Sequence, residues 1–400
     1  MPGILFISTH NFTTNPRLVK EIDLALRNNY EVSALCCSFN NWSKENNEKI
    51  KLRLISQINY YEIPGNRTPF IPWVLSSFWF SFSKIMLQFF PENLYFLSLN
   101  SNKRSWLLLQ KNKEISEKVD LVISHNPGSF YPAMKFAQRN KIPFGIDLED
   151  YHPGETTNEK SIRNLKNLLK KILPKAAYLS AASPLILQYT LNDIVPYEKQ
   201  TEVIRNWFPS TEFQRPLEIN KERLQIVWFS QNIAVGRGLE QIIPVIKKYE
   251  STIELHLYGN MQQPFFREWL KDIKNIIVHK ALPQKELHKE LSKYDIGLAI
   301  EPGKDLNNEL AISNKILAYV QAGLFVLASN TVAQKEFLIQ YINAGILTEL
   351  DENSFTKNIE FLLKEKENLR LQKQKRFIGA QDYCWENESE KLLQTWKQTV

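Results

Sequence analysis

The sequence predicts an α/β protein with two Rossmann-like, doubly wound domains in tandem and a C-terminal helical segment. Two observations predict this fold class. Short apolar runs alternate with amphipathic helical stretches along the chain, which is the pattern of parallel strands joined by crossover helices. In addition, 400 residues are enough for two domains that each bury a core of their own.

Two series of apolar runs give the predicted strands, and runs of this kind are typical of strands buried on both faces. The first series is 4–8, 31–36, 121–125, 143–147, 177–182 and 202–206. The second series is 224–230, 253–259, 276–281, 296–301, 324–329 and 346–350. The polar, proline-containing stretch 207–222 separates them. We therefore predict domains at 1–207 and 208–375, and a helical segment at 376–400 that packs back on the first domain.

The composition limits the possible classes of protein. The chain has 50 Lys and Arg against 43 Asp and Glu, and this modest excess argues against nucleic acid as a partner. The only cysteines are Cys36, Cys37 and Cys384, which support neither a disulfide framework nor a structural zinc site. The first residues lack the basic segment and apolar core of a secretory signal, so a cytoplasmic location is expected.

Two loops in the second half have features of an anion site. Gly236 and Gly238 flank Arg237 between a strand and a helix, where backbone amides and a guanidinium favour phosphate. A flexible turn with a solvated Arg237 is the alternative. Further on, Ser313 is expected to cap a helix that has Lys315 in its first turn. A lysine there opposes the helix dipole, so either an anion binds it or the lysine is simply exposed.

The run 313–323, Ser-Asn-Lys-Ile-Leu-Ala-Tyr-Val-Gln-Ala-Gly, resembles the donor-binding signature of GT-B-fold glycosyltransferases related to the family 4 retaining enzymes. Other blocks follow in the order of that family. They are Asn-Pro-Arg at 15–17, Ser-His-Asn-Pro at 124–127, Ala-Ser-Pro at 182–184, Val-Ile-Arg-Asn at 203–206 and Gly-Arg-Gly at 236–238. The resemblance covers almost the whole chain.

The resemblance implies transfer of a sugar from a nucleotide-diphosphate sugar to a glycan or lipid-linked acceptor, in bacterial cell-surface polysaccharide biosynthesis. It implies a retaining reaction in which the leaving phosphate assists the acceptor hydroxyl, without metal or cofactor. Arg237 and Lys315 would hold the diphosphate, and Glu309 would contact the donor sugar or ribose. The remaining donor-binding residues would be Gly236, Gly238, Ser313 and Asn314.

Two positions depart from the family pattern. Ala318 stands where the family typically has a second glutamate, and Gln231 stands near a position that is often arginine. These departures put the ribose contact in question. They also keep two alternatives open, namely a GT-B-fold sugar-nucleotide epimerase and a catalytically silent sugar-nucleotide-binding subunit.

The first half would supply the acceptor side. The resemblance implies that His125, at the end of a strand, lies close to the transferred sugar, where a neutral imidazole can donate or accept a hydrogen bond. A buried structural histidine is the alternative. Glu149 or Asp150 would orient the acceptor hydroxyl, and topology places His10 and Asn11 near the same edge. The acidic cluster also admits a metal-binding GT-A fold, but two α/β series disfavour it.

Two segments predict contact with an anionic membrane surface. Residues 69–90 are rich in Trp and Phe, and residues 160–173 form a cationic amphipathic helix. The prolines, serines and Lys84 of the first make it a poor bilayer span, so it is expected to lie in the interface. The alternative is a pair of core-packing helices with solvated lysines.

Overall fold

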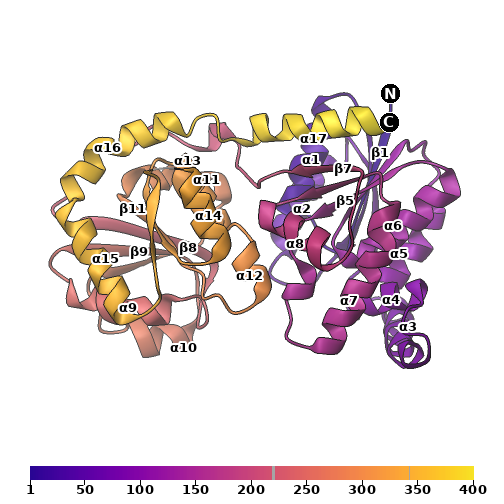
Figure 1. Ribbon diagram of the computed structural model, residues 1–400, viewed down its shortest axis with the longest axis horizontal. Coiled ribbons are helices and arrows are strands. Elements are labelled where there is room, and N and C mark those ends of the chain that lie inside the picture. Colours follow the sequence, from indigo (N-terminus) through magenta and orange to yellow (C-terminus); the bar gives the residue numbers. More distant parts are fainter. Residues whose placement is uncertain (219–220, 342) are drawn as a thin grey trace. The chain divides into compact units, whose positions relative to one another are not determined.

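The computed structural model describes residues 1–218, 221–341 and 343–400 and divides into two compact units (Figure 1). Unit 1 comprises Met1–Arg205 and Ser389–Val400, and unit 2 comprises Asn206–Glu388. The predicted boundary after residue 207 is two residues from this division. Residues 219–220 of the predicted linker lie outside the described residues. Trp207 and Phe208, at its start, are buried in the core of unit 2.

Unit 1 contains a parallel sheet with the strand order β3-β2-β1-β4-β5-β6-β7. Its strands are Gly3–Ser8 (β1), Glu31–Ser38 (β2), Asn59–Pro64 (β3), Leu121–His125 (β4), Phe144–Leu148 (β5), Tyr178–Ala181 (β6) and Gln200–Val203 (β7). The chain order reverses between β1 and β4, so this is the topological switch point. Strand β3 is absent from the predicted series because it is a half-exposed edge strand with a mixed polar sequence.

The helices of unit 1 connect these strands. They are Pro16–Arg27 (α1), Lys44–Leu54 (α2), Phe70–Phe89 (α3), Leu94–Ser101 (α4), Ser105–Lys111 (α5), Pro127–Asn140 (α6), Glu159–Ile172 (α7) and Pro184–Asp193 (α8). Short 3₁₀ turns occur at Asn112–Glu114, His152–Gly154 and Leu173–Lys175. Helix α1 begins at the Asn-Pro-Arg block of residues 15–17. Asn15 caps the helix by accepting the N–H of Leu18, and Pro16 takes the first helical position.

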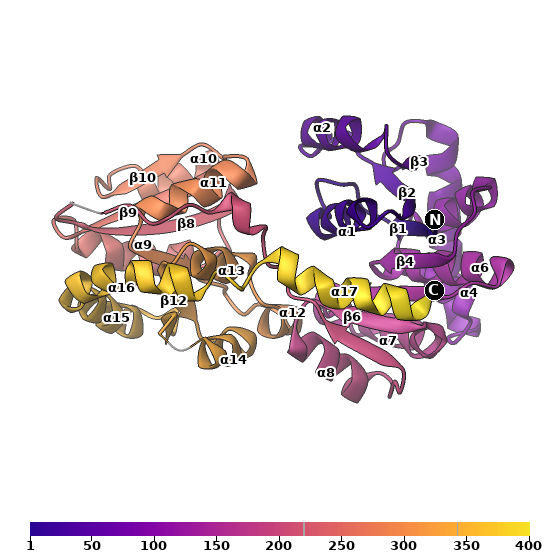
Figure 2. The same cartoon turned by 90° about the horizontal axis from the view of Figure 1, so that it is seen from above.

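Unit 2 contains a second parallel sheet, in the order β10-β9-β8-β11-β12-β13. Its strands are Leu224–Ile233 (β8), Ile253–Met261 (β9), Ile276–His279 (β10), Ile296–Ala299 (β11), Phe325–Ser329 (β12) and Gly345–Thr348 (β13). Alternate side chains enter separate cores on the two faces: Ile226 and Trp228 lie in one, and Val227 lies in the other. The two sheets with their helices confirm the predicted tandem doubly wound fold (Figure 2).

The helices of unit 2 include the one predicted from the cap at Ser313. They are Leu239–Lys248 (α9), Gln263–Phe265 (α10), Gln284–Glu290 (α11), Leu306–Leu310 (α12), Asn314–Gln321 (α13), Val332–Gln340 (α14), Glu352–Lys364 (α15) and Lys366–Gly379 (α16). Short 3₁₀ turns occur at Ser210–Glu212 and Leu291–Lys293, and Phe266–Leu270 forms a π-helical turn. Ser313 accepts the N–H of Lys315, and Gly323, at a φ of 73°, follows the end of α13.

The last helix, α17 (Trp385–Thr399), begins in unit 2 and ends in unit 1. Within unit 1 its Trp396 is fully buried, donates a hydrogen bond to the hydroxyl of Tyr178 over 3.0 Å, and contacts Phe6 and Tyr30 edge-on. Of the segment predicted to pack on the first domain, 376–400, only Ser389–Val400 belongs to unit 1.

Candidate functional site

The loop from β8 to α9 presents Arg237 between two glycines that have left-handed backbone conformations. Gly236 and Gly238 have φ values of 82° and 83°, which residues with a side chain rarely adopt. The N–H of Gly236 donates to Glu240 Oε1 over 2.6 Å, so the first turn of α9 fixes the loop. Arg237 is exposed. The sequence therefore builds a defined turn that carries a cation into solvent.

The loop from β11 leads to a compact ionic group centred on Glu301. Its Oε1 accepts from Lys315 Nζ at 2.6 Å and from Ser313 Oγ at 2.9 Å. The N–H of Glu301 donates to Ser329 Oγ at the end of β12. The Lys315 side chain is only 13% exposed, and its ammonium also lies over the Trp228 ring. The cation that opposes the α13 dipole is thus balanced by a carboxylate of the same chain.

A cavity of about 330 Å³ connects the two loops. Its lining consists of Val235, Gly236, Arg237, Glu301, Pro302, Lys304 and Asn308. Arg237 therefore shares a cavity with the carboxylate that binds Lys315, and Lys315 itself is not among the lining residues. Sequence reasoning missed Glu301, Lys304 and Asn308. The signal for Lys304 was the neighbouring Gly303, whose φ of 59° marks a built turn after a strand.

The other donor-side candidates occupy the surroundings of this cavity. Asn314 Oδ1 accepts a hydrogen bond from Asn206 Nδ2 over 2.9 Å. Glu309 Oε2 accepts the N–H of Val332 at the start of α14 over 3.1 Å, so its charge lies at the positive end of that helix. Ala318 is fully buried and Gln231 is exposed. Glu309 is thus next to the cavity loop rather than in the cavity lining.

The carboxyl edge of unit 1 carries a buried cluster of charged side chains at the switch point. Arg17 forms a two-pronged ion pair with Asp147, with Nε 2.6 Å from Oδ2 and Nη2 2.7 Å from Oδ1. His125 lies between Glu149, 2.9 Å from its Nδ1, and Glu21, 3.3 Å from its Nε2. The Asn-Pro-Arg block thus supplies both a helix cap and a buried counter-charge.

This geometry corrects the prediction for His125. The side chain is fully buried, and both of its ring nitrogens face carboxylates, so it does not present a free nitrogen at the edge. Burial alone would lower the pKa of His125, but Glu21 and Glu149 raise the pKa to about 10. The ring is therefore an imidazolium at neutral pH. This charge state differs from the neutral imidazole expected from the sequence, and it is produced by Glu21 and Glu149, which are distant in the chain.

Three other ionisable groups of this edge have different environments. Burial raises the pKa of the Glu149 carboxyl, but His125 and Arg17 lower it further, so that the pKa is about 2. The Glu149 side chain is 23% exposed. Asp150 is half-buried beside it. His10 is also half-buried, and burial lowers its pKa, so this imidazole is neutral at pH 7. Its Nδ1 lies 3.3 Å from Asn126 Nδ2, which places the ring proton on Nε2.

Asn11 does not fit the predicted acceptor role. It is fully buried, its Nδ2 donates to Ser43 Oγ over 2.8 Å, and its Oδ1 accepts from the N–H and hydroxyl of Thr14. The side chain thus ties the loop after β1 together. His10, Glu149 and Asp150 remain as the polar groups at this edge that a ligand can reach.

Glu21, His125 and Asp147 also place potential metal-ligand atoms within 4.8 Å of one another. However, the Arg17 guanidinium already lies 2.6 Å from Asp147 and 3.4 Å from Glu21. Positive charge therefore reaches these carboxylates from arginine and imidazolium, and the cluster is suited to holding α1 against β4 and β5.

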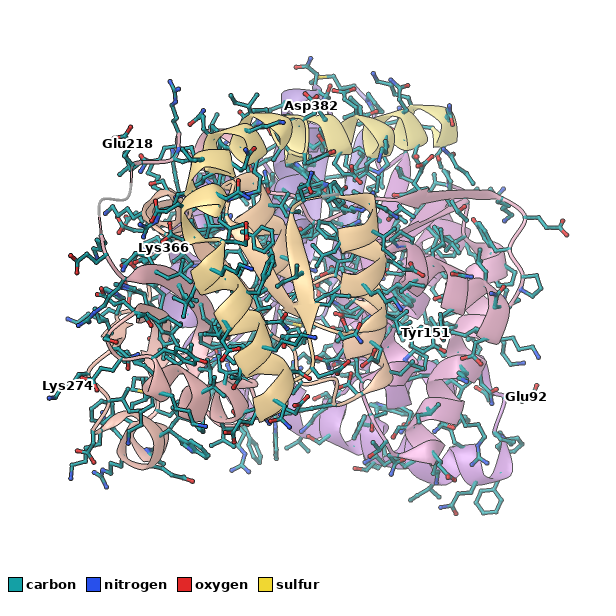
Figure 3. All side chains as sticks on the ribbon, turned by 60° about the vertical axis from the view of Figure 1, so that its left-hand side comes forward. Glu92, Tyr151, Glu218, Lys274, Lys366 and Asp382 are labelled. Atoms are coloured by element: carbon teal, nitrogen blue, oxygen red, sulfur yellow. The ribbon has the colours of Figure 1, made fainter. Side chains whose placement is uncertain are left out.

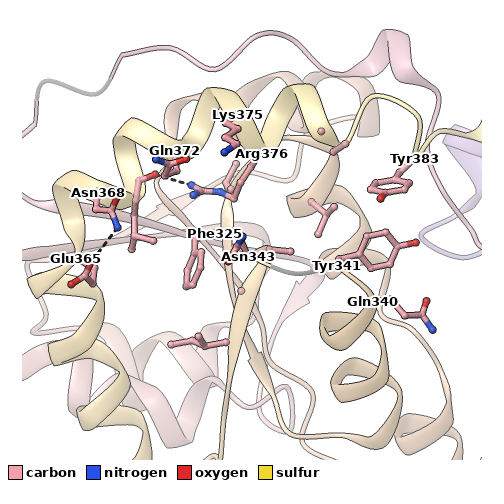
Figure 4. Close-up of a pocket in the computed structure, with 18 of the residues that line it drawn as sticks. Phe325, Gln340, Tyr341, Asn343, Glu365, Asn368, Gln372, Lys375, Arg376 and Tyr383 are labelled. Carbon is pink, nitrogen blue, oxygen red and sulfur yellow. Dashed lines mark hydrogen bonds between the residues drawn. The ribbon is translucent and has the colours of Figure 1, made fainter.

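A larger cavity, of about 680 Å³, lies elsewhere in unit 2 (Figure 4). It borders the first residues of β12 and β13, Phe325 and Gly345, and the helix α16. Arg376 reaches into this region and donates to the carbonyls of Gly323 and Leu369. The cavity is at the amino ends of the strands, whereas the Arg237 cavity follows their carboxyl ends, where ligands of parallel sheets usually bind.

No protein-family model and no curated protein matches the sequence. Solved structures, in contrast, match the entire chain. Anabaena HepE in complex with UDP aligns with a TM-score of 0.68 at 13% identity, covering 100% of both chains. Sucrose-phosphate synthase from Thermosynechococcus elongatus gives 0.67 at 13%, over 100% of this chain and 99% of the other. The lipopolysaccharide outer core galactosyltransferase WaaB gives 0.61 at 13%, over 100% of both.

These similarities establish the architecture. The chain has the tandem Rossmann-like fold of GT-B glycosyltransferases, and the similar structures include such enzymes. The GT-A alternative is contradicted, because the chain contains two separate parallel sheets. HepE was also solved with UDP-glucose and with UDP and glucose together.

Proposed function

We propose that this protein is a glycosyltransferase that moves a sugar from a nucleotide-diphosphate donor to a glycan or lipid-linked acceptor. The observation that carries the proposal is the cation group of unit 2. Arg237 and Lys304 line one cavity after the carboxyl ends of β8 and β11, and Glu301 of the same lining holds Lys315. The solved structures with a similar fold include HepE in complex with UDP and with UDP-glucose.

The chemistry of sugar transfer accounts for these residues. Breaking the bond from sugar to phosphate leaves a nucleoside diphosphate with increased negative charge, and fixed cations stabilise that charge in the transition state. The backbone amides at the start of α9 and the cap of α13 add hydrogen-bond donors for phosphate oxygens. In this proposal Lys315 exchanges Glu301 for the diphosphate when the donor binds. Glu301 is then free to accept hydrogen bonds from the sugar hydroxyls.

On the acceptor side, the proposal replaces His125 with His10. A neutral imidazole with its proton on Nε2 can donate a hydrogen bond to an acceptor or sugar oxygen, whereas the buried imidazolium of His125 positions Glu149. Glu149, ionised and partly exposed, and Asp150 would orient the acceptor hydroxyl. His125 is thus a positioning residue.

The finer features of the proposal follow the resemblance of the sequence to the family 4 enzymes. The reaction would retain the anomeric configuration, with the leaving phosphate assisting the incoming hydroxyl, and would need neither metal nor cofactor. The pathway would be bacterial cell-surface polysaccharide biosynthesis. The enzyme would act in the cytoplasm or on the inner face of the plasma membrane, without a nucleic-acid partner.

Donor turnover with and without acceptor tests the proposal against its two alternatives. Purified protein is incubated with UDP- and GDP-sugars, with or without lipid-linked sugar acceptors, and products are resolved by mass spectrometry. Transfer that requires the acceptor supports the proposal. Isomerisation of the donor without acceptor would instead indicate an epimerase, and binding without turnover would indicate a silent subunit.

A further inference from the structure

Helix α3 has one buried face and, opposite to it, an apolar face that the chain leaves uncovered. Ser76, Ser83 and Leu87 face inward and are buried, where the helix packs on α4 and α5. The opposite face follows a helical spacing of three and four residues and is open to solvent. Its exposed side chains are Ile71 (71%), Val74 (38%), Leu75 (40%), Phe78 (56%), Ile85 (54%) and Phe89 (71%). We call these six residues the α3 face.

In length and composition, α3 is the one helix among the described residues that suits a membrane crossing, and only 17% of its most apolar window is buried. Its packing indicates a different geometry. Trp79 stacks on Trp106 of α5, and Phe82 packs edge-on against Phe96 of α4. A crossing helix would give up these contacts. A helix that stays on unit 1 exposes one apolar face, which suits insertion parallel to a bilayer surface.

The charged residues of the chain segment that contains α3 are almost all positive. Lys103 and Arg67 lie over the ring of Trp73 at the start of the helix, at 4.3 and 5.1 Å from the centroid. Lys84 lies over Phe80 at 4.4 Å. Between Ile63 and Lys113 the only carboxylate in the sequence is Glu92.

Glu92, labelled in Figure 3, is itself neutralised, because Lys171 of α7 lies 3.0 Å from it. The segment that contains the α3 face therefore carries several cations and no unpaired carboxylate. Cations beside inserted aromatic side chains are attracted to anionic headgroups.

Helix α7 contributes differently from what the sequence predicted. Its apolar side, with Leu168, Leu169 and Ile172, is buried against unit 1. The apolar side of α7 is therefore not available to lipid. For this side, the alternative of a core-packing helix holds. Lys160, Arg163 and Lys170 on its other side are exposed and add to the positive charge of unit 1.

We propose that the α3 face inserts into the surface of an anionic lipid bilayer, with Arg67, Lys84 and Lys103 at the headgroups. The charges favour this occupant over a second copy of the chain. In a two-fold symmetric contact, the same patch meets itself, so these cations would face their own copies. Anionic lipid supplies the opposite charge. The docking is independent of the proposed donor chemistry, because every residue involved lies in unit 1.

Sedimentation with vesicles tests the docking. The full-length protein is mixed with phosphatidylcholine vesicles, or with vesicles that also contain phosphatidylserine, at low and high salt. The wild type is expected to bind the anionic vesicles more tightly, and salt should weaken the binding. The variant F78S/F89S should lose roughly tenfold or more of its partition for each phenylalanine removed, since burial of one such side chain shifts an equilibrium by about that factor.

The matched control is L371S/I378S, which removes two apolar side chains of α16 in unit 2 that are 79% and 61% exposed. It should bind vesicles as the wild type does. R67Q/K103Q should lose the preference for phosphatidylserine but keep weak binding to both vesicles. Circular dichroism checks that all variants are folded.

The proposal is overturned if the wild type ignores both vesicles or if folded F78S/F89S binds as well as the wild type. It is equally overturned if the wild type is a dimer in solution that F78S/F89S dissociates, since the face would then be occupied by a second copy. UDP titration of F78S/F89S should be unchanged, which separates a failure of docking from a failure of the donor site.

Discussion

Replacing Glu301 with glutamine should tighten the binding of UDP. The Glu301 carboxylate holds Lys315 Nζ at 2.6 Å and faces the same cavity as Arg237, so it competes with an incoming diphosphate for the ammonium and repels its charge. The side chains of Glu301 and Lys315 are 20% and 13% exposed, so solvent screens their interaction only in part. Glutamine keeps an acceptor oxygen for Ser313 and Lys315 but carries no charge.

The magnitude follows from the difference between charged and neutral hydrogen bonds. A hydrogen bond with charged partners contributes about 1.5 to 3 kcal/mol, and a neutral one about 0.5 to 1.5 kcal/mol. E301Q should therefore release Lys315 by roughly 1 to 1.5 kcal/mol, which corresponds to a gain in UDP affinity of roughly five- to tenfold. The free energy of unfolding should fall by a similar amount, because the same interaction is lost from the folded chain.

Isothermal titration calorimetry with UDP at low ionic strength measures the effect, with GDP as a second probe. The control is E360Q, which makes the same charge change at an exposed position of α15. It should leave both affinities unchanged. An affinity of E301Q equal to or weaker than that of the wild type would show that Lys315 does not pass from Glu301 to the diphosphate.

Three further predictions concern both units. Alanine at Arg237, Lys304 or Lys315 should weaken UDP binding by about 1.5 to 3 kcal/mol each, and titrations identical to wild type would remove the donor site. Because the pKa of His125 is raised to about 10 from 6.5, its stabilising contribution is complete below pH 6.5 and is lost as pH rises through about 10. Melting temperatures should therefore fall from pH 7 to 10, and less so in H125Q; equal slopes would contradict the assignment. Trp396→Ala should lower the free energy of unfolding by about 3 to 5 kcal/mol, which chemical denaturation measures; a change below about 1 kcal/mol would show that the contact is dispensable.

The predictions that succeeded rest on local signals. The cap at Ser313 and the turn at Gly323 define α13, and the apolar runs locate the buried strands, because these features depend on residues close in the chain. Strand β3 escaped detection because an edge strand needs no continuous apolar run. The turn around Arg237 could also be predicted, since its left-handed backbone conformations favour the glycines on either side.

The charge states of the buried side chains and the exposed face of α3 could not be predicted from the sequence. The environment of His125 comes from Glu21 and Glu149, which are distant in the chain and meet it only in the folded sheet. Lys315 was expected to be free for an anion, but its partner Glu301 is 14 residues away on another loop. Likewise, the Trp and Phe residues of 69–90 predict a helix that lies in a membrane interface, but only packing decides that Trp79 turns inward and Phe78 outward.

The route of the chain through α17 has a consequence for biosynthesis. Unit 1 needs Trp396 against Tyr178, Phe6 and Tyr30, yet this residue is translated only after all of unit 2. The aromatic contact that completes unit 1 therefore forms only after the residues of unit 2 have been synthesised. A chain truncated before Trp396 would leave the side chains of Phe6, Tyr30 and Tyr178 without this cover.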